Sequence, residues 1–409
     1  ASALSEGRIR NTGVTMAIKL TEKQIKDGWQ IVKFGDIAKE VKLTTKNPAE
    51  DGLEFYVGLD HLDPQSLRIA RKGIIAEDKP SFTRRFSAGQ ILFGKRRCYQ
   101  KKAAVAGFEG ICSGDIIVMD ATPKKIIPGL LPFIIQSDAF FDWAEKTSSG
   151  SLSPRTKWKS LAEFEFPLPP IERQKEILEV LEKLEENKRR TLDAVGSLEQ
   201  IKYLYGYYRC KDVDSDQITL KKIGELKNGV NKSKSDFGKG SPFVNLDDVF
   251  ASESISSEPS GLVNVSQSEI DNYSLKPNDI LFVRSSVKPS GVALTAIITE
   301  DLKDTVYAGF LIRLRPKSQF DSQYLNYCFH EPHFRHRIMA YVTISANSNI
   351  NQDGLENTVI YYPDSTERNQ VKEFYSRTEK SIQAFKKKEL TLNYLSRSVT
   401  HKLLNGGVQ

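Results

Sequence analysis

The chain has 409 residues, of which 39% are hydrophobic and 27% charged, and its formal net charge is +7. Such a length supports two to four domains with their own cores, and the mild basic excess is compatible with a polyanionic partner. The sequence contains no run of about eighteen apolar residues, the length that a membrane-spanning helix needs. Its four cysteines are scattered and include no CxxC pair, so they provide no disulfide framework. We therefore expect a protein of the reducing cytoplasm.

Residues 1–16 lack the apolar core of a secretory signal, and we interpret them as a tail or an upstream remnant. Residues 17–166 are predicted to form a mixed α+β domain. A small helix is expected at Phe34–Glu40 and a longer helical stretch at Leu130–Lys146, followed by a polar loop at Ser148–Pro154. Short strands are expected at Leu53–Leu59, Ile91–Phe93, Ala103–Val105 and Ile116–Met119.

Residues 167–210 are predicted to form one long helix. The prolines of PLPPIERQ (Pro167–Gln174) end the preceding structure, because proline fixes φ and disfavours helix in the residue before it. Apolar side chains then recur in one stripe at Leu178, Leu181, Leu184, Leu192, Val195, Leu198, Ile201 and Tyr205. A long rod with a single stripe requires a partner helix. Its charged middle, Glu185–Arg190, either stays solvated or docks another subunit.

The partner helix is expected at residues 363–409. PDSTERNQ (Pro363–Gln370) opens a second helical pattern, which we expect to stop at Gly406 and Gly407. Its stripe consists of Val371, Phe374, Thr378, Ile382, Phe385, Leu392, Leu395, Val399 and Leu403. We expect the two helices to pair.

Residues 211–362 repeat the order of elements in the first domain. Strands are expected at Leu220–Leu226, Pro242–Leu246, Ile280–Val283, Ala293–Ile298 and Gly309–Leu314, and helix at Phe320–Val342. Four matches recur in one order, 187 to 195 positions apart: Phe34–Asp36 with Ile223–Glu225, Tyr56–Asp60 with Phe243–Asp247, Ala88–Phe93 with Pro277–Phe282, and Glu172-Arg173 with Glu367-Arg368. The predicted fold is α+β: two similar mixed domains with a pair of long antiparallel coiled-coil helices, an internal duplication with a pseudo-two-fold axis.

Common catalytic motifs are missing from the sequence. Gly238–Ser241 imitates a phosphate-binding loop but lacks the GxxxxGK[ST] spacing, and Asn47–Glu50 differs at two positions from the motif of amino-methyltransferases. No Ser/His/Asp or Cys/His order stands out among five histidines. This pattern favours a binding protein without catalytic residues.

One segment, CFHEPHFRH, contains the metal-capable residues Cys328, His330, His333 and His336. Pro332 interrupts the helical spacing that would bring these side chains together. We interpret the segment as helical with partly exposed histidines, and we predict no metal site.

Two basic loops follow equivalent strands, Gly94–Lys102 (GKRRCYQKK) in the first half and Val283–Lys288 (VRSSVK) in the second. Arginine can bridge guanine O6 and N7, while lysine mainly neutralises phosphate. The alternative is an ordinary solvated loop. The candidate DNA-contacting residues in and before these loops are Arg84, Arg85, Lys95, Arg96, Arg97, Lys101, Lys102, Arg284, Ser285, Ser286 and Lys288.

A second pair of loops is rich in small polar residues. Ser148–Ser151 runs into Pro154–Lys159, and Ser345–Gln352 holds the corresponding place in the second half. Short polar side chains suit phosphate oxygens, and asparagine can read adenine, although a flexible connection is an equal alternative. The candidate DNA-contacting residues here are Arg155, Lys157, Lys159, Asn347, Asn349 and Asn351.

This organisation resembles the DNA-specificity subunit of type I restriction–modification systems, from Trp29 to Gly406. Its most specific local features are PLPPIERQ and the pair GQILFGKRR and NDILFVRSS. The second helix departs from the family pattern, because Pro363–Thr366 lacks the Pro-Leu-Pro-Pro run.

The resemblance implies a non-catalytic, cytoplasmic prokaryotic protein in which each domain reads one half-site of double-stranded DNA and the helices set an unread spacer. It implies two DNA adenine methyltransferase subunits and restriction (translocase) subunits as partners. S-adenosylmethionine, ATP and Mg²⁺ would belong to those partners, and this chain would hold no cofactor. The alternatives are a stand-alone sequence-specific DNA-binding protein, and a nuclease or methylase with unrecognisable motifs.

Overall fold

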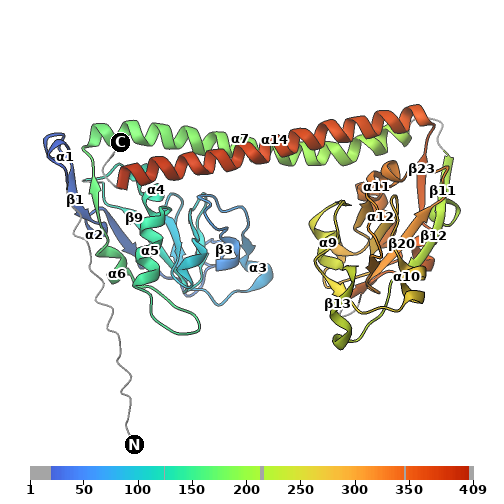
Figure 1. Ribbon diagram of the computed structural model, residues 1–409. Helices are drawn as coiled ribbons and strands as arrows, with labels where there is room; N and C mark the ends of the chain where they lie inside the picture. Colours follow the sequence, from blue (N-terminus) through green and yellow to red (C-terminus); the bar gives the residue numbers. More distant parts are fainter. Residues whose placement is uncertain (1–19, 124, 212–215, 345–346, 405–409) are drawn as a thin grey trace, which may run out of the picture. The chain divides into compact units, whose positions relative to one another are not determined.

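The computed structural model describes residues 20–123, 125–211, 216–344 and 347–404 (Figure 1). Contacts divide the chain into two compact units: unit 1 is residues 1–190 with 388–409, and unit 2 is residues 191–387. Each unit contains one globular part and a portion of both long helices. The predicted division into a tail, two domains and two separate helices therefore stays a prediction. The predicted tail at residues 1–16 and the predicted helix stop at Gly406 and Gly407 lie outside the described residues.

Unit 1 contains two four-stranded sheets and a ribbon. The first sheet has the antiparallel order β2 (Ala38–Val41), β9 (Ile116–Ala121), β6 (Ile91–Gly94), β7 (Ala103–Val105). The second has the order β4 (Gly73–Ile74), β3 (Phe55–Val57), β8 (Gly110–Cys112), β5 (Arg84–Phe86), in which β3 and β8 are parallel. β1 (Gln30–Lys33) pairs with β10 (Glu165–Leu168). All of β6 is buried, because Ile91 and Phe93 join one apolar cluster and Leu92 joins another.

Helices cover the first sheet of unit 1. α5 (Asp138–Lys146) supplies Phe141, whose ring stacks on Phe93 with 5.5 Å between centroids, and Phe140, which lies 4.6 Å from Phe34. The other helices are α1 (Glu22–Lys26), α2 (Phe34–Ile37), α3 (Ile75–Asp78), α4 (Leu131–Ile135) and α6 (Trp158–Ala162), with 3-10 turns at Leu59–His61, Cys98–Gln100 and Pro128–Leu130. This aromatic layer forms the main core of unit 1.

Unit 2 is built from the same kinds of element. Its five-stranded sheet has the order β12 (Gly224–Asn228), β20 (Leu311–Pro316), β16 (Ile280–Val283), β18 (Thr295–Ile298), β14 (Ser254–Ile255). Two three-stranded sheets have the orders β15 (Leu262–Val263), β13 (Phe237–Val244), β19 (Val306–Tyr307) and β17 (Ser285–Ser286), β22 (Ser348–Asn349), β21 (Thr343–Ile344). β11 (Asp216–Thr219) pairs with β23 (Val359–Tyr362). The helices are α8 (Leu220–Ile223), α9 (Leu246–Ala251), α10 (Gln267–Tyr273), α11 (Ser322–His330), α12 (Pro332–Met339) and α13 (Gln352–Glu356), with 3-10 turns at Lys234–Asp236 and Pro289–Gly291.

The internal duplication is visible in the strand pairing. β6 and β16 are each a buried strand flanked by antiparallel neighbours, as the matched strings Ile91–Phe93 and Ile280–Phe282 predict. β3 and β13 each make a parallel pair, β3 with β8 and β13 with β19. One match was out of register: α2 and α8 each follow the first paired strand, so Phe34 corresponds to Leu220 and not to Ile223.

Several predicted element boundaries were wrong, and tertiary contacts explain them. The helix expected at Phe34–Glu40 ends at Ile37, because β2 hydrogen-bonds to β9. The strand expected at Leu220–Leu226 begins as helix α8, because Leu220 and Ile223 are both buried and three residues apart. The helical stretch Leu130–Lys146 is interrupted at Ser137, whose hydroxyl caps α5 by accepting from the Phe140 N–H.

The two long helices are α7 (Ile171–Lys211) and α14 (Ser365–Leu404), and they pack together as predicted. Gln174 secures the start of α7, where it accepts a hydrogen bond from the Ile127 N–H at 3.0 Å. In unit 2, Arg209 pairs with Glu367 and Tyr205 stacks on Phe374, so the helices run antiparallel. Among the described residues, none of the helices combines the length and hydropathy that a membrane crossing requires.

The stripe predicted for α7 is correct at Leu181 and Val195, which are buried, and wrong at Leu192 and Ile201. Leu192 is 44% exposed and Ile201 is 51% exposed. Their neighbours Thr191 and Lys202 are buried instead. Successive residues of a helix point about 100° apart, so a one-residue offset turns an apolar side chain out of the contact. On α14, Val371, Thr378, Ile382 and Leu403 are buried as predicted, while Leu395 is exposed.

Candidate nucleic-acid interface

The two candidate loops of unit 1 lie against each other. The Thr156 N–H donates to the Lys95 carbonyl at 3.0 Å, and the Arg97 N–H donates to the Pro154 carbonyl at 2.8 Å. Arg96 pairs with Arg155, and Arg155 in turn pairs with Ser149, in two antiparallel bridges. We call this row, Arg96–Arg155–Ser149, the loop ladder of unit 1. It joins a basic loop to a Ser/Gly loop that the sequence presents as separate features.

Unit 2 has a loop ladder at the same place in its fold. Ser285 of β17 pairs with Asn349 of β22, and Asn349 pairs with Thr343 of β21. The Ile350 N–H donates to the Arg284 carbonyl at 2.9 Å, as Thr156 does to Lys95 in unit 1. The structure therefore brings together the predicted loop residues in both units, and the ladder is a duplicated feature.

Charges on the ladder of unit 1 are organised by Asp115, which sequence reasoning missed. Arg155 Nε donates to Asp115 Oδ1 at 2.8 Å, and Arg96 Nη1 lies 3.4 Å from Asp115 Oδ2. The hydrogen bond from Arg155 holds the pKa of this carboxyl below its usual range, and the charge of Arg96 adds to the effect. Both guanidinium groups remain partly exposed, so the shared carboxylate holds them in place at the surface. The sequence signal that could have identified Asp115 is its place as an acidic residue in the turn Ser113–Asp115, just before β9.

Other predicted contact residues of unit 1 make internal interactions. Arg84 donates to the Ile116 carbonyl at 2.9 Å, and Lys102 donates to the Leu59 carbonyl at 2.7 Å. Arg85 lies 3.5 Å from Glu109, and Lys101 forms an ion pair with Asp138. The remaining candidates of unit 1 are Lys95 and Arg97, which are half-buried, and Lys157 and Lys159, which are exposed. Arg84, Arg85, Lys101 and Lys102 thus have internal contacts of their own, and we keep the ladder and its neighbours as the candidate interface of unit 1.

The ladder of unit 2 is polar and less charged. Arg284, Ser285 and Ser286 are half-buried, and Lys288 is exposed. Asn349 Nδ2 donates to the Asn347 carbonyl at 3.0 Å. Asn351 caps α13 by accepting from the Gly354 N–H at 2.8 Å, so its side chain already has a structural role.

The histidine-rich segment falls on two helices and its members face different partners. His330 Nε2 lies 3.0 Å from the Thr295 carbonyl, His333 stacks on Tyr207 with 3.6 Å between centroids, and His336 is exposed. Across the described part of the chain, no group of three or more His, Cys, Asp or Glu side chains is arranged to hold a metal ion.

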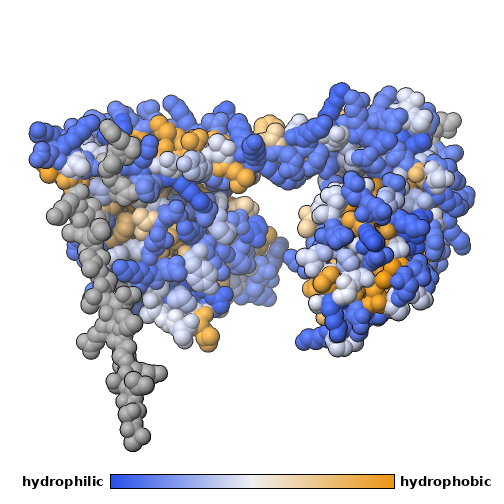
Figure 2. All heavy atoms as spheres, viewed as in Figure 1, coloured by the Kyte–Doolittle hydropathy of each residue, from blue (hydrophilic) through white to orange (hydrophobic). Residues whose placement is uncertain are grey.

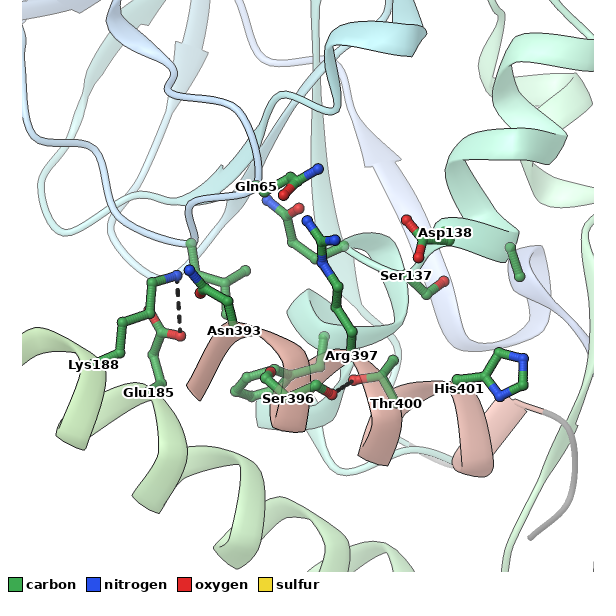
Figure 3. Close-up of a pocket in the computed structure, with 14 residues that line it drawn as sticks. Gln65, Ser137, Asp138, Glu185, Lys188, Asn393, Ser396, Arg397, Thr400 and His401 are labelled. Atoms are coloured by element: carbon green, nitrogen blue, oxygen red, sulfur yellow. Dashed lines mark hydrogen bonds and ion pairs between the residues drawn. The ribbon is translucent and has the colours of Figure 1, made fainter. Parts of the chain in front are cut away.

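A pocket in unit 1 lies where the globular part meets both long helices (Figure 3). Arg397 of α14 points toward Gln65, and Lys188 of α7 pairs with Glu185 at 3.8 Å (Figure 3). Asp138, on the opposite wall, is neutralised by Lys101. Part of the predicted polar middle of α7 therefore faces this pocket. Two ion pairs, Lys188 with Glu185 and Lys101 with Asp138, involve residues of its wall, and we assign the pocket a structural role.

Three comparisons relate this chain to known proteins. The family model "Type I restriction modification DNA specificity domain" matches residues 26–202. The EcoDI specificity subunit of a type I restriction enzyme from Escherichia coli is 28% identical over 161 residues, covering 39% of this chain and 35% of the relative. The EcoKI specificity subunit from Escherichia coli strain K12 is 22% identical over 273 residues, covering 61% and 58%. The chain thus matches about a third of one relative's length and somewhat more than half of the other's.

A solved structure shares the fold across nearly the whole chain. It comes from a study of complex assembly and conformational transition of a type I restriction–modification system. The TM-score is 0.59 at 18% sequence identity, with 93% of this chain and 98% of the other covered. The mixed α+β architecture with paired long helices is therefore a known arrangement.

Proposed function

We propose that this chain is a DNA specificity subunit of a type I restriction–modification system and that it recognises a bipartite DNA sequence. Each unit reads one half-site, and the bases between the half-sites are not read. The observation that carries the proposal is the duplicated loop ladder, which presents Arg96 and Arg155 in unit 1 and serine and asparagine side chains in unit 2. These are the residue types that hydrogen-bond to base edges and phosphates.

We propose that the contact surface consists of basic and small polar residues on and beside the two ladders. In unit 1 these are Lys95, Arg96, Arg97, Arg155, Lys157 and Lys159. In unit 2 they are Arg284, Ser285, Ser286, Lys288, Asn347 and Asn349. The other candidates stabilise the loops through internal contacts; they are Arg84, Arg85, Lys101, Lys102 and Asn351.

The partners in this proposal are two DNA adenine methyltransferase subunits and restriction (translocase) subunits. Exposed apolar side chains on α14 support a docking role for the helices: Leu390 is 70% exposed and Tyr394 is 71% exposed. Hydrophobic side chains gather over the helix pair of unit 1 in Figure 2. S-adenosylmethionine, ATP and Mg²⁺ act in the partners, and the chain itself performs no catalytic step. The relatives come from Escherichia coli, which supports a setting in the bacterial cytoplasm.

The test is to map methylated adenines in the native genome and then to measure binding of the purified complex to that target. We expect a two-part methylated sequence, and an affinity that falls steeply with salt because basic side chains displace counterions from phosphates. Absence of a two-part methylated motif would contradict the specificity role. Specific binding by the chain without any co-purifying methyltransferase would instead identify a stand-alone DNA-binding protein.

A further inference from the structure

The most exposed large hydrophobic side chain of each unit, among the described residues, lies beside its loop ladder. In unit 1 this is Leu152, which is 90% exposed, and in unit 2 it is Val287, which is 80% exposed. A single exposed hydrophobic side chain needs no explanation. An exposed side chain of this kind beside the ladder of both units does need one, although the two lie on different loops: Leu152 is in the turn between Ser149 and Arg155, and Val287 follows β17.

Leu152 stands at the tip of a tightly held loop. Ser149 and Arg155 exchange backbone hydrogen bonds of 3.0 and 2.9 Å, which close the loop beneath the leucine. Gly150 has a φ of +112°, a conformation that other residues rarely adopt, and Arg96 Nη2 donates to Ser153 Oγ at 3.1 Å. The loop lies between α5 and α6 on the side of unit 1 away from α7 (Figure 1), and a small hydrophobic patch lies over it in Figure 2.

Val287 directly follows the ladder strand β17. The Lys288 N–H donates to Ser286 Oγ at 3.2 Å, and a 3-10 turn begins at Pro289. Ile344, which is 68% exposed, lies on β21 opposite Ser348, the residue that also pairs with Ser286. The apolar side chains of unit 2 thus border the polar row of its ladder.

The chemistry of the major groove identifies what such a side chain can contact. Hydrogen-bonding groups line most of each base edge, and the C5-methyl group of thymine is the apolar exception. A fixed aliphatic group beside arginine or serine donors matches an edge that presents a methyl group beside acceptors. Because the loops are held before binding, little conformational entropy is lost when that contact forms.

We propose that Leu152 and Val287 each pack against a thymine methyl group in the major groove, so that each unit selects an A·T pair at one position of its half-site. This inference rests on the proposed function. It adds two specificity-determining residues that hydrogen-bonding patterns do not reveal. Arg155 and the serine and asparagine groups of the ladders then supply the polar contacts around the methyl group.

The test replaces the thymines of the mapped target one at a time with deoxyuridine, which lacks only the methyl group. Binding is measured with the full chain in its complex. We expect one thymine in each half-site whose replacement weakens binding about fourfold, the change that corresponds to ~0.8 kcal/mol for burial of one methyl-sized group. Leu152→Ala abolishes this sensitivity in one half-site and Val287→Ala in the other.

The matched control is Ile25→Ala, which truncates a side chain that is 62% exposed on α1 of unit 1 and retains both sensitivities. Equal affinity for thymine and deoxyuridine at every position, with the intact target still preferred over random DNA, would overturn this inference alone. Loss of affinity in Leu152→Ala with the thymine sensitivity intact would overturn it as well. Equal binding of target and random DNA by the unaltered complex would instead contradict the proposed function.

Discussion

At the scale of single residues, the carboxylate of Asp115 decides how the ladder of unit 1 presents its positive charge. It accepts a hydrogen bond from Arg155 Nε at 2.8 Å and lies 3.4 Å from Arg96 Nη1, and its side chain is only 21% exposed. An arginine held by a partner loses less rotamer entropy on binding than an unrestrained side chain does. We therefore propose that Asp115 is a positioning residue for the two arginines.

Asp115→Asn is expected to lower the free energy of unfolding of unit 1 by about 1 kcal/mol or less at neutral pH, since the arginines are partly exposed. Folding lowers the pKa of this carboxyl, so its contribution is complete above about pH 4, the ordinary value for Asp, and is lost as the pH falls below that range. Denaturant unfolding of both proteins from pH 7 to pH 3 measures the difference, which should shrink on acidification.

A suitable control for this pH series is Asp142→Asn on α5, because Asp142 is exposed and lies off the ladder. It should behave like the unaltered chain at every pH. A stability difference for Asp115→Asn that stays constant down to pH 3 would contradict the assigned role of its charge.

At the scale of elements, unit 2 fixes its globular part to both long helices through one buried lysine. Lys202 of α7 is buried, and its Nζ lies 3.1 Å from Glu253 and 2.9 Å from Glu379 of α14. Burial opposes the charge of Lys202, but the two carboxylates outweigh this effect and raise its pKa. Tyr203 adds a hydrogen bond to Glu253. At this point of α7 the predicted apolar stripe had Ile201, but the buried side chain is that of Lys202, and the contact with α14 is this polar network.

Lys202→Met is expected to destabilise unit 2 by about 2–3 kcal/mol, because it leaves two carboxylates near each other without their cation. The value is below that for a fully buried pair, since Glu379 is 43% exposed. Lys386→Met offers a matched comparison: Lys386 also links α14 to α7, through Glu199 at 3.4 Å, but this pair is about half exposed. We expect a change below about 1 kcal/mol there. Equal losses in the two variants, measured by denaturant unfolding, would refute the importance of burial.

At the scale of the whole molecule, the two units share two continuous helices. α7 has 41 residues and α14 has 40, and both contribute to each unit. We propose that helix length sets the number of unread bases between the half-sites, as spacing between paired readers does in dimeric DNA-binding proteins.

Removal of seven residues from each helix where the units divide, 188–194 from α7 and 385–391 from α14, tests this. Seven residues correspond to ~10 Å of helix, or about three base pairs. Selection of target DNA from a library with randomised spacers should return the same half-sites with a shorter preferred spacer. Removal from α7 alone serves as the contrast, because it misaligns the paired helices and should lower stability. An unchanged spacer after the paired removal would mean that helix length is not the determinant.

Much of this architecture follows from local patterns in the sequence. Prolines before Ile171, apolar steps of three and four residues, and the matched strings around Ile91 and Ile280 predict the long helices, the duplication and the central strands. These features depend on residues close together in the chain, so periodicity and backbone geometry reveal them. The family resemblance adds the expectation of DNA recognition.

Tertiary structure alone decided how those parts meet. Lys95 and Thr156 are neighbours only because β6 and the segment after α5 converge, and neither stretch encodes its partner. The roles of Asp115 and Lys202 depend on groups far away in the chain. A charge run looks the same whether its residues form internal ion pairs or face solvent, since composition records charge and not its partner. Side-chain partners are chosen by packing and desolvation over long sequence separations, and for that reason the sequence determined the elements and the fold determined the site.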